Sequence, residues 1–293
     1  MMNWMKWKWL YFLLSAVVII PGLVSLFMFG LRPSIDFTGG SLLEYRFGQE
    51  INPQEVEKFL TENNYEVYSL TSSGERTYLL RLPPLEKDQV IEIKALLSEK
   101  LSQEPEEIRF EVVGPTLGKE LLLKTILAIV LAAGFILAYV AWRFKNAKFG
   151  VCAILAMFHD SLVILGSFSL LGHFLGVEVD TLFVTAVLTI LSFSVHDTVV
   201  VYDRIRESQK LFPNSSFESL VNKAVTETLS RSLNNSLTII FMLVALLLLG
   251  GMTIKWFVAA LLIGTISGTY SSTFNAAPLL VVWENLIQRR KKS

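Results

Sequence analysis

An ionisable pair, His196 and Asp197, lies inside one of the most apolar segments of this chain. The surrounding stretch, SFSVHDTVVVYDRIRE, begins as apolar as a membrane span and ends as a charged loop. An ionisable side chain deep in a bilayer costs roughly 2.5–3.5 kcal/mol on insertion scales, so it marks a functional site by default. Asp197 precedes Arg204 by seven residues, or about 10 Å of helix, which is a long way for a short carboxylate to reach toward water. The alternative is a helix end whose acid simply reaches water.

Small residues share the helical faces of two acids in apolar segments. The first face has residues at i, i+3, i+7 and i+10, namely Ser194, Asp197, Val201 and Arg204. The second acid is Asp160, whose face also carries Ala153, Ala156 and Ser167. Small residues on these faces indicate that each acid faces a helix bundle and not lipid. Two such acids are the parts of a proton relay; the alternative is a pair of structural hydrogen bonds, for example from Asp160 to a serine.

Arg231, just before a later apolar segment, is the candidate counter-charge for Asp197; the alternative is an ordinary cation kept on the cytoplasmic side. His159 and His196 each precede an acid, but adjacent helical residues point about 100° apart, so neither pair forms a metal clamp. Cys152 is the single cysteine, and the sequence has no zinc, P-loop or nucleophile-elbow spacing. We therefore expect neither enzyme activity nor a bound cofactor.

The elements that position these residues belong to an integral membrane protein. The chain has 293 residues, of which 52% are hydrophobic and 18% charged, and its mean hydropathy is +0.50. The net charge is zero, but residues 31–118 hold 16 acidic and nine basic residues. No region carries the basic patch that phosphate binding needs, so we expect no nucleic-acid partner.

Six apolar segments predict membrane spans. They lie at about 10–29, 121–142, 149–171, 181–202, 236–249 and 256–283. Trp4, Trp7 and Trp9 alternate with lysines before the first span, as is typical at lipid headgroups. That span lacks a small-residue cleavage site, so we expect a retained anchor. The sixth carries Gly264 and Gly268, a G-x-x-x-G face that lets a neighbouring helix approach closely.

Residues 31–118, between the first two spans, have the pattern of a soluble domain. Strands are predicted at 41–47, 66–70, 76–82 and 108–113, with helices at 52–63 and 86–101 and a turn at 71–74. The order βαββαβ is that of the ferredoxin-like unit, an antiparallel sheet covered on one face by two helices. The segment contains no His and no Cys, so we predict a binding or mechanical module without chemistry of its own.

The fold class is thus a polytopic helical membrane protein with three predicted regions. These are residues 1–30 (tail and first span), 31–118 (soluble domain) and 119–293 (five spans), the last including a polar cytoplasmic segment at 204–233. In that segment Ser215 and Glu218 form a capping box, and apolar residues recur at helical spacing up to Leu229. We predict an amphipathic helix lying on the membrane surface there.

Positive charges in the short loops predict that both termini are cytoplasmic and that the acidic domain is outside. The short outer loops offer only Lys255. The inner side would collect Lys6, Lys8, Arg143, Lys145, Lys148, Arg204, Arg206, Lys210, Lys223, Arg231, Arg289, Arg290, Lys291 and Lys292.

Five stretches together resemble the SecD/SecF family of bacterial protein-export membrane subunits, on its SecF side, a family related to the resistance-nodulation-division (RND) exporters. They are IDFTGGSLLEYRF, VGPTLGKEL, FHDSL, SFSVHDTVVVYDRIRE and LSRSLNNSLT, and they span nearly the whole chain. The resemblance implies an RND-like half of six spans with an extracytoplasmic ferredoxin-like domain, in the bacterial cytoplasmic membrane. It also implies pairing with a separate SecD polypeptide, association with the SecYEG channel, an insertase and other accessory subunits, and proton-driven export of unfolded polypeptide.

By the same resemblance, Asp197 is the proton-carrying acid of the fourth span and Arg231 is the functional arginine before the fifth. Asp160 is included in this relay not through the resemblance but because it lies near the middle of the third span on a face of small residues. Supporting roles are expected for neighbours of Asp197: Ser194, His196, Asp203 and Arg204.

An alternative function is a proton-coupled small-molecule or ion exporter, because six spans with buried acids suit a transporter equally well. Against it, polar residues concentrate around the third to fifth spans and no internal repeat is found. A passive scaffold would leave Asp197 without a role. The small-residue sixth span and the acid-bearing faces are too polar to face lipid, so we expect the isolated subunit to be poorly stable without SecD.

Overall fold

The computed structural model describes residues 3–144 and 146–292, and it divides into two compact units. The helix unit comprises Met1–Leu31, Ala128–Val177 and Leu182–Ser293, and the sheet unit comprises Arg32–Leu127 and Glu178–Thr181. Lys145 and the side chains of Lys291 and Lys292, three of the predicted inner cations, lie outside the described residues. The boundaries predicted at residues 30 and 118 stay a prediction.

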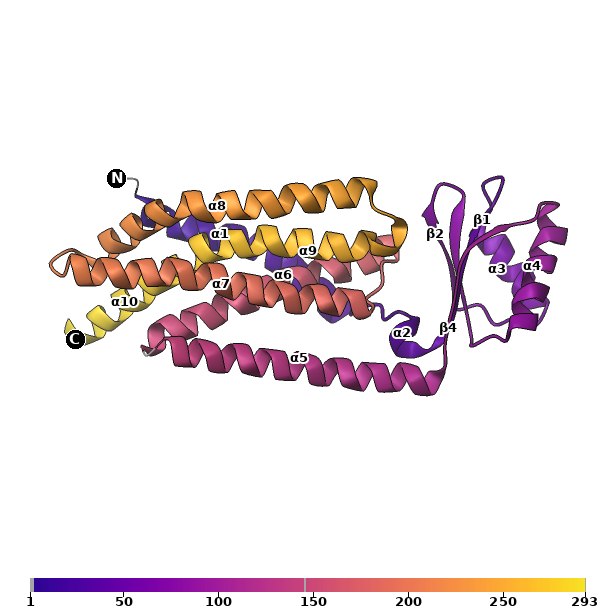
Figure 1. Cartoon of the computed structure of the whole chain (residues 1–293), viewed down its shortest axis with the longest axis horizontal. Helices are drawn as coiled ribbons and strands as arrows, with labels where there is room; N and C mark the ends of the chain where they lie inside the picture. Colours follow the sequence, from indigo (N-terminus) through magenta and orange to yellow (C-terminus); the bar gives the residue numbers. More distant parts are fainter. Residues whose placement is uncertain (1–2, 145, 293) are drawn as a thin grey trace. The chain divides into compact units, whose positions relative to one another are not determined.

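Six helices in the described residues are long and apolar enough to cross a membrane, in agreement with the six predicted spans. The chain is therefore a multi-pass membrane protein. After a 3₁₀ turn, η1 (Trp4–Trp7), they are built from α1 (Lys8–Phe29), α5 (Pro115–Arg143), α6 (Ala147–Leu175), α7 (Thr181–Leu211), α8 (Phe217–Leu249) and the run α9 (Met252–Ser271), η2 (Ser272–Ala276) and α10 (Ala277–Lys292) (Figure 1).

The predicted surface helix does not exist as a separate element. It is the first part of α8, which continues without a break into the fifth span, because no Gly or Pro interrupts Phe217–Leu249. Its apolar face packs against protein, since Val221 and Val225 are fully buried. The η1 turn is joined to it by hydrogen bonds from Met5 N to Asn222 Oδ1 (2.9 Å) and from Trp4 Nε1 to Thr226 Oγ1 (3.0 Å). The prediction of a helix lying on the membrane surface is therefore wrong.

The sixth span is interrupted by η2, a π-helical turn between α9 and α10. A π turn leaves a backbone carbonyl without its usual intrahelical donor, and such turns gather at functional sites. Here the hydroxyl of Tyr202 on α7 donates to the carbonyl of Ala276 at 2.9 Å. Tyr202 thus stabilises the turn from the helix that also carries Asp197.

The predicted G-x-x-x-G contact is confirmed, and it lies within this chain. A Cβ atom at Gly268 would lie 3.3 Å from the ring of Phe193 on α7, and one at Gly264 would meet Ile164 and Ile190. The small-residue face of α9 is therefore covered by α6 and α7. It gives no reason by itself for the isolated subunit to need a partner.

Helices α1 and α6 meet backbone to backbone at Gly22 and Gly166. A Cβ atom at Gly166 would lie 2.6 Å from the Cα of Gly22, which is closer than two non-bonded carbon atoms can approach. We expect Gly166→Leu to push α1 away from α6 and to cost about 1–3 kcal/mol or more through overpacking. Thermal unfolding of the full chain in detergent measures the effect. Gly134→Leu on α5, where a Cβ would meet nothing within 4 Å, is the matched control; equal melting of the two variants contradicts the prediction.

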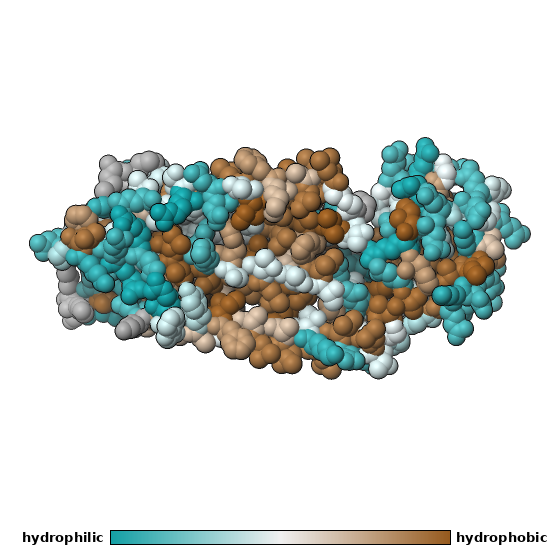
Figure 2. Space-filling model, in the orientation of Figure 1, coloured by the Kyte–Doolittle hydropathy of each residue, from teal (hydrophilic) through white to brown (hydrophobic). Residues whose placement is uncertain are grey.

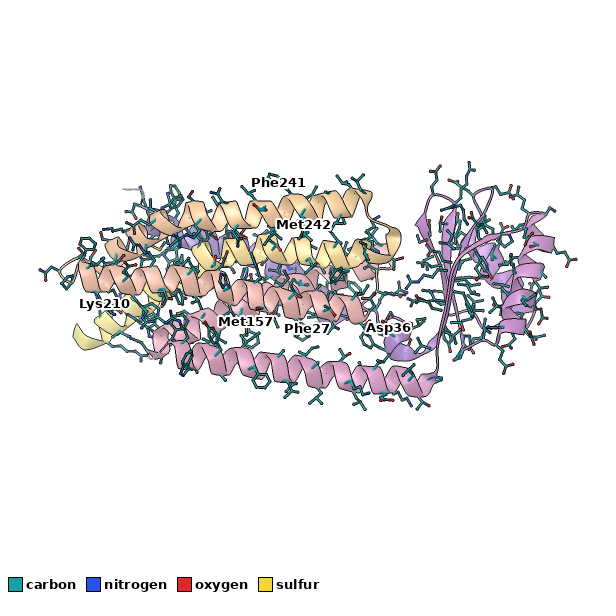
Figure 3. All side chains as sticks on the ribbon, viewed as in Figure 1. Phe27, Asp36, Met157, Lys210, Phe241 and Met242 are labelled. Atoms are coloured by element: carbon teal, nitrogen blue, oxygen red, sulfur yellow. The ribbon has the colours of Figure 1, made fainter. Side chains whose placement is uncertain are left out.

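The outer surface of the helix unit is broadly apolar. Residues 119–139 of α5 include no buried side chain, and α8 presents Phe241 and Met242, 67% and 55% exposed (Figure 3). Figure 2 shows this apolar surface over the middle of the helix unit, with hydrophilic side chains toward the end where α7 turns into α8. Such a band is what a bilayer, or the helices of a membrane partner, would cover.

The sheet unit has the predicted order of strands and helices. Its elements are α2 (Ile35–Thr38), β1 (Gly40–Arg46), α3 (Pro53–Glu62), β2 (Ser69–Gly74), β3 (Thr77–Leu82), α4 (Lys87–Leu101) and β4 (Glu106–Val113). The sheet is antiparallel with strand order β2-β3-β1-β4, and α3 and α4 lie on the same face (Figure 1). Leu43 and Leu80 of the sheet pack with Leu60 of α3 and Ile93 of α4 in one buried core.

Two local details of the sheet unit differ from the prediction. Strand β2 extends through the predicted turn at 71–74, and the chain reverses instead at Glu75 and Arg76. Thr71 and the following serines suit an edge strand, and Arg76 takes up the left-handed conformation (φ +55°) that the tight turn needs. The short helix α2, in the IDFTGG stretch, was not predicted.

The loop before α7 belongs to the sheet unit. Ser34 N donates to the Val179 carbonyl (2.9 Å), and Val179 N donates to the Arg32 carbonyl (2.8 Å). Asp36 Oδ2 accepts hydrogen bonds from the backbone N (3.1 Å) and the hydroxyl (2.9 Å) of Thr181. Since Thr181 is the first residue of α7, Asp36 fixes the start of the helix that carries Asp197.

Candidate functional site

Asp160 is fully buried on α6 and accepts hydrogen bonds from three hydroxyl groups. Ser194 Oγ on α7 donates at 2.5 Å, and Ser267 Oγ and Ser271 Oγ on α9 each donate at 2.6 Å. A fourth contact joins Asp160 Oδ1 to His159 Nδ1 at 3.0 Å. The carboxylate is therefore satisfied by donors from three helices, as the structural alternative for Asp160 anticipated.

The network continues from His159 to two further polar residues. His159 Nε2 lies 3.0 Å from Ser15 Oγ on α1, and Ser15 Oγ lies 2.8 Å from Asn275 Nδ2 and 3.0 Å from Asn275 Oδ1 on η2. This part of the site was not predicted from the sequence. A signal was present, because Ser267, Ser271 and Asn275 follow one another at i, i+4 and i+8 along an apolar span.

Asp197 is the second buried acid, and it has fewer hydrogen-bond partners than Asp160. It is 5% exposed, and Ser232 Oγ on α8 donates to its Oδ2 at 2.8 Å. Among the described residues this is the one hydrogen bond that the structure records for the Asp197 carboxylate. One turn further along α8, Ser236 Oγ accepts from Thr269 Oγ1 on α9 at 2.6 Å. The Asp197 site therefore lies where α7 meets α8, with α9 nearby.

Arg231 is not in contact with Asp197. It is exposed and forms no ion pair with any residue in the described part of the chain. Its neighbour Ser232 faces Asp197 instead, and consecutive helical residues point about 100° apart. The predicted cation is thus next in sequence to Ser232, the α8 residue that contacts the carboxylate, but its own side chain is exposed and turned away from Asp197.

The predicted supporting residues serve different partners. Ser194 bonds to Asp160 and not to Asp197, and His196 is exposed. Arg204 pairs with Glu207 and Glu227 at 2.5 and 2.6 Å. Asp203 pairs with Arg143 and, at 3.4 Å, with Arg206.

Helix α7 joins the two centres, because Ser194 contacts Asp160 and Asp197 follows three residues later on the same face. A change in the position of α7 would therefore alter the hydrogen-bond contacts of both acids. In the described residues no group of three or more His, Cys, Asp or Glu side chains could hold a metal ion. The proton-relay role of Asp160 and Asp197 stays a prediction.

Comparison with known families gives two matches in this chain. Residues 93–286 match the family described as "Protein export membrane protein SecD/SecF, C-terminal", and residues 24–51 match the "SecD/SecF GG Motif". The second match contains the IDFTGG stretch, with Asp36 and α2.

Curated relatives cover nearly the whole chain. The protein translocase subunit SecF of Thermobaculum terrenum is 44% identical over 97% of this chain and 95% of its own length. That of Anaerolinea thermophila is 40% identical, again over 97% of this chain and 95% of its own length. The protein translocase subunit SecDF of Thermus thermophilus is 36% identical over 94% of this chain, which corresponds to 38% of that longer protein.

Two solved structures have a similar fold. The crystal structure of SecDF from Thermus thermophilus, described as a translocon-associated membrane protein, matches with a TM-score of 0.87 and 34% identity over 97% of this chain and 39% of its own. A SecDF structure in a form called super-membrane-facing matches with a TM-score of 0.69 and 33% identity over 99% and 40%. On the sequence match over most of its length and on this fold, the chain belongs to the SecD/SecF family of protein-export membrane proteins.

Proposed function

We propose that this chain works with SecD to use the proton gradient in promoting polypeptide export through the SecYEG channel of the bacterial cytoplasmic membrane. The observation that carries the proposal is a buried, sparsely bonded carboxylate, Asp197, in a chain of the SecD/SecF family. The relative from Thermus thermophilus is named SecDF and is more than twice as long as the matched part, which supports SecD as a partner. The proposal needs no cofactor and no metal ion.

The proton would bind at Asp197. Burial away from water disfavours the charged form of a carboxylate, while an approaching cation favours it. Ser232 now faces Asp197, and Arg231 is the next residue on α8. A rotation or shift of α8 against α7 that brings Arg231 inward would release the proton, and proton binding would favour the present arrangement. A ligand biases a two-state equilibrium only through such a difference in affinity.

Helix α7 would pass this change on to the sheet unit. Its first residue, Thr181, is held by Asp36, and the preceding Val179 pairs with the chain at Arg32 and Ser34. One of the matched SecDF structures is described as a super-membrane-facing form, which supports a fold with more than one arrangement.

The sheet unit would be a ferredoxin-like domain on the outer side of the membrane, with both termini of the chain in the cytoplasm. Its acidic composition and length suit a domain that crosses regardless of charge, and the positive charges of the short loops favour this orientation. Its edge strands, β2 and β4, would contact the exported polypeptide by strand addition.

Export into inverted membrane vesicles tests the proposal. Vesicles that contain SecYEG and SecD should export a precursor faster when this chain is present and a proton gradient is imposed. The gain should vanish when an ionophore collapses the gradient. The chain should also copurify with SecD and SecYEG in mild detergent. A gain that survives the ionophore would contradict proton coupling, and the export of a small dye in place of polypeptide would favour the exporter alternative.

A further inference from the structure

The His159 imidazole lies between hydrogen-bond partners that suit both of its protonation states. Its side chain is 12% exposed. In the neutral state, Nδ1–H donates to Asp160 Oδ1 (3.0 Å), Nε2 accepts from the Ser15 hydroxyl (3.0 Å), and Ser15 Oγ accepts from Asn275 Nδ2 (2.8 Å). In the charged state, Nε2–H donates to Ser15 Oγ, whose hydroxyl then donates to Asn275 Oδ1 (3.0 Å). One hydroxyl rotation converts the first arrangement into the second.

Asp160 is suited to remain a carboxylate next to this imidazole. It faces four donors, the hydroxyls of Ser194, Ser267 and Ser271 and the Nδ1 atom of His159. A protonated carboxyl group would add a fifth hydrogen to the site and give up one of its acceptor positions. Hydrogen bonds to the charged form stabilise that form. The proton that this site can gain or lose is therefore on His159.

Apart from Asp160, the described residues recorded in contact with His159 are uncharged. Tyr270 on α9 has its ring 6.4 Å from the imidazole, and its hydroxyl donates to the backbone carbonyl of Tyr11 on α1 at 2.7 Å. The structure records no Lys or Arg in contact with this cluster among the residues that it describes. A buried carboxylate without a cation is costly. A protonated His159 supplies that cation, so the pair can alternate between one net negative charge and none.

We propose that His159 is a second proton-binding site of this chain, with Asp160 as a fixed charge that positions and stabilises the imidazolium. Two observations carry this independently of Asp197: the double set of partners for the imidazole, and the π turn that places Asn275 against Ser15, the hydroxyl partner of His159 Nε2. The inference deepens the proton coupling proposed above. Ser194 on α7 donates a hydrogen bond to Asp160. Proton binding at His159 would therefore change the contacts of the helix that carries Asp197.

The test is an NMR titration of the full chain in lipid nanodiscs, labelled with ¹⁵N-histidine. The chain has three histidines, and His173→Gln and His196→Gln assign the signals. The His159 signals are followed from pH 5 to 9, and a change of protonation state is the expected result. Asp160→Asn should weaken proton binding at His159 about tenfold or more, because the nearby negative charge is lost. Ser161→Ala, whose hydroxyl bonds to its own helix at Met157, should leave the titration unchanged.

A His159 that keeps one protonation state over this range, or the same midpoint with Asp160→Asn, overturns the inference. If Asp160→Asn does not fold, His159→Gln decides, because glutamine can hydrogen-bond but cannot bind the proton. In the vesicle assay it should remove most of the gradient-dependent export, and normal export with an unchanged pH profile refutes the role of His159. The titration needs no export, so it can fail while the proposed function stands; conversely, a titrating His159 in a chain that does not stimulate export would refute the function alone.

Discussion

Replacement of Asp197 by asparagine should abolish the gradient-dependent part of export. Asparagine keeps the size of the side chain, and its Oδ1 can still accept the hydrogen bond from Ser232. It cannot gain or lose the proton, so the two arrangements of α7 and α8 would no longer respond to the gradient. Export into inverted vesicles, with and without an ionophore, measures the loss, and copurification with SecD checks assembly.

The control lies on the same helix. Thr189 is exposed on α7, and its hydroxyl bonds to its own backbone at Thr185, so Thr189→Val should export normally. Arg231→Ala should lose the gradient response in the same way as Asp197→Asn, because the arginine is the proposed counter-charge in the other arrangement. A correctly assembled Asp197→Asn complex that exports at the normal rate, with its gradient dependence intact, would show that the role given to Asp197 is wrong.

Replacement of Asp160 by alanine should destabilise the helix unit severely. It removes the acceptor of three buried serine hydroxyls and the anion beside His159. A buried donor left unpaired costs about 1–3 kcal/mol, and breaking a buried charge network costs about 3–5 kcal/mol. Thermal unfolding of the full chain in detergent should show a large drop in melting temperature, or no folded protein.

Two other substitutions in α6 provide a scale for the loss of stability expected of Asp160→Ala. Ser161→Ala, on the next residue of α6, removes a hydroxyl that donates to the Met157 carbonyl of its own helix, and it should change the melting temperature little. Asp160→Asn keeps one acceptor oxygen, but its NH₂ group would face the serine hydroxyls that now donate to the carboxylate. We therefore expect an intermediate loss of stability and a partial export defect. Wild-type melting of Asp160→Ala would mean that the network does not hold α6, α7 and α9 together.

The two acids therefore differ in what their surroundings allow. Among the residues that the structure describes, Asp160 has four hydrogen-bond contacts that fix its position, whereas Asp197 has one. A group that must bind and release a proton during a conformational change needs partners that can change, and the single contact with Ser232 on α8 meets this need. The structural role considered for Asp160 and the relay role considered for Asp197 are both consistent with these contacts.

The sequence by itself determined the features that depend on local patterns. Apolar runs predicted six spans, and alternation and helical spacing predicted the order of elements in the sheet unit, because burial imposes periods of about 3.6 and 2 residues on helices and strands. The cost of burying charge singled out Asp160 and Asp197. The small-residue face of α9 likewise followed from the spacing of Gly264 and Gly268.

Only the tertiary structure decided which residues meet. The partners of Asp160 come from α7 and α9, residues 34 to 111 positions away in sequence, and no local pattern encodes a pairing at that distance. Ser232 rather than its neighbour Arg231 faces Asp197, because the rotation of α8 about its axis is set by packing along its whole length. For the same reason the apolar face of the first part of α8, which by itself suits a membrane surface, is buried against protein.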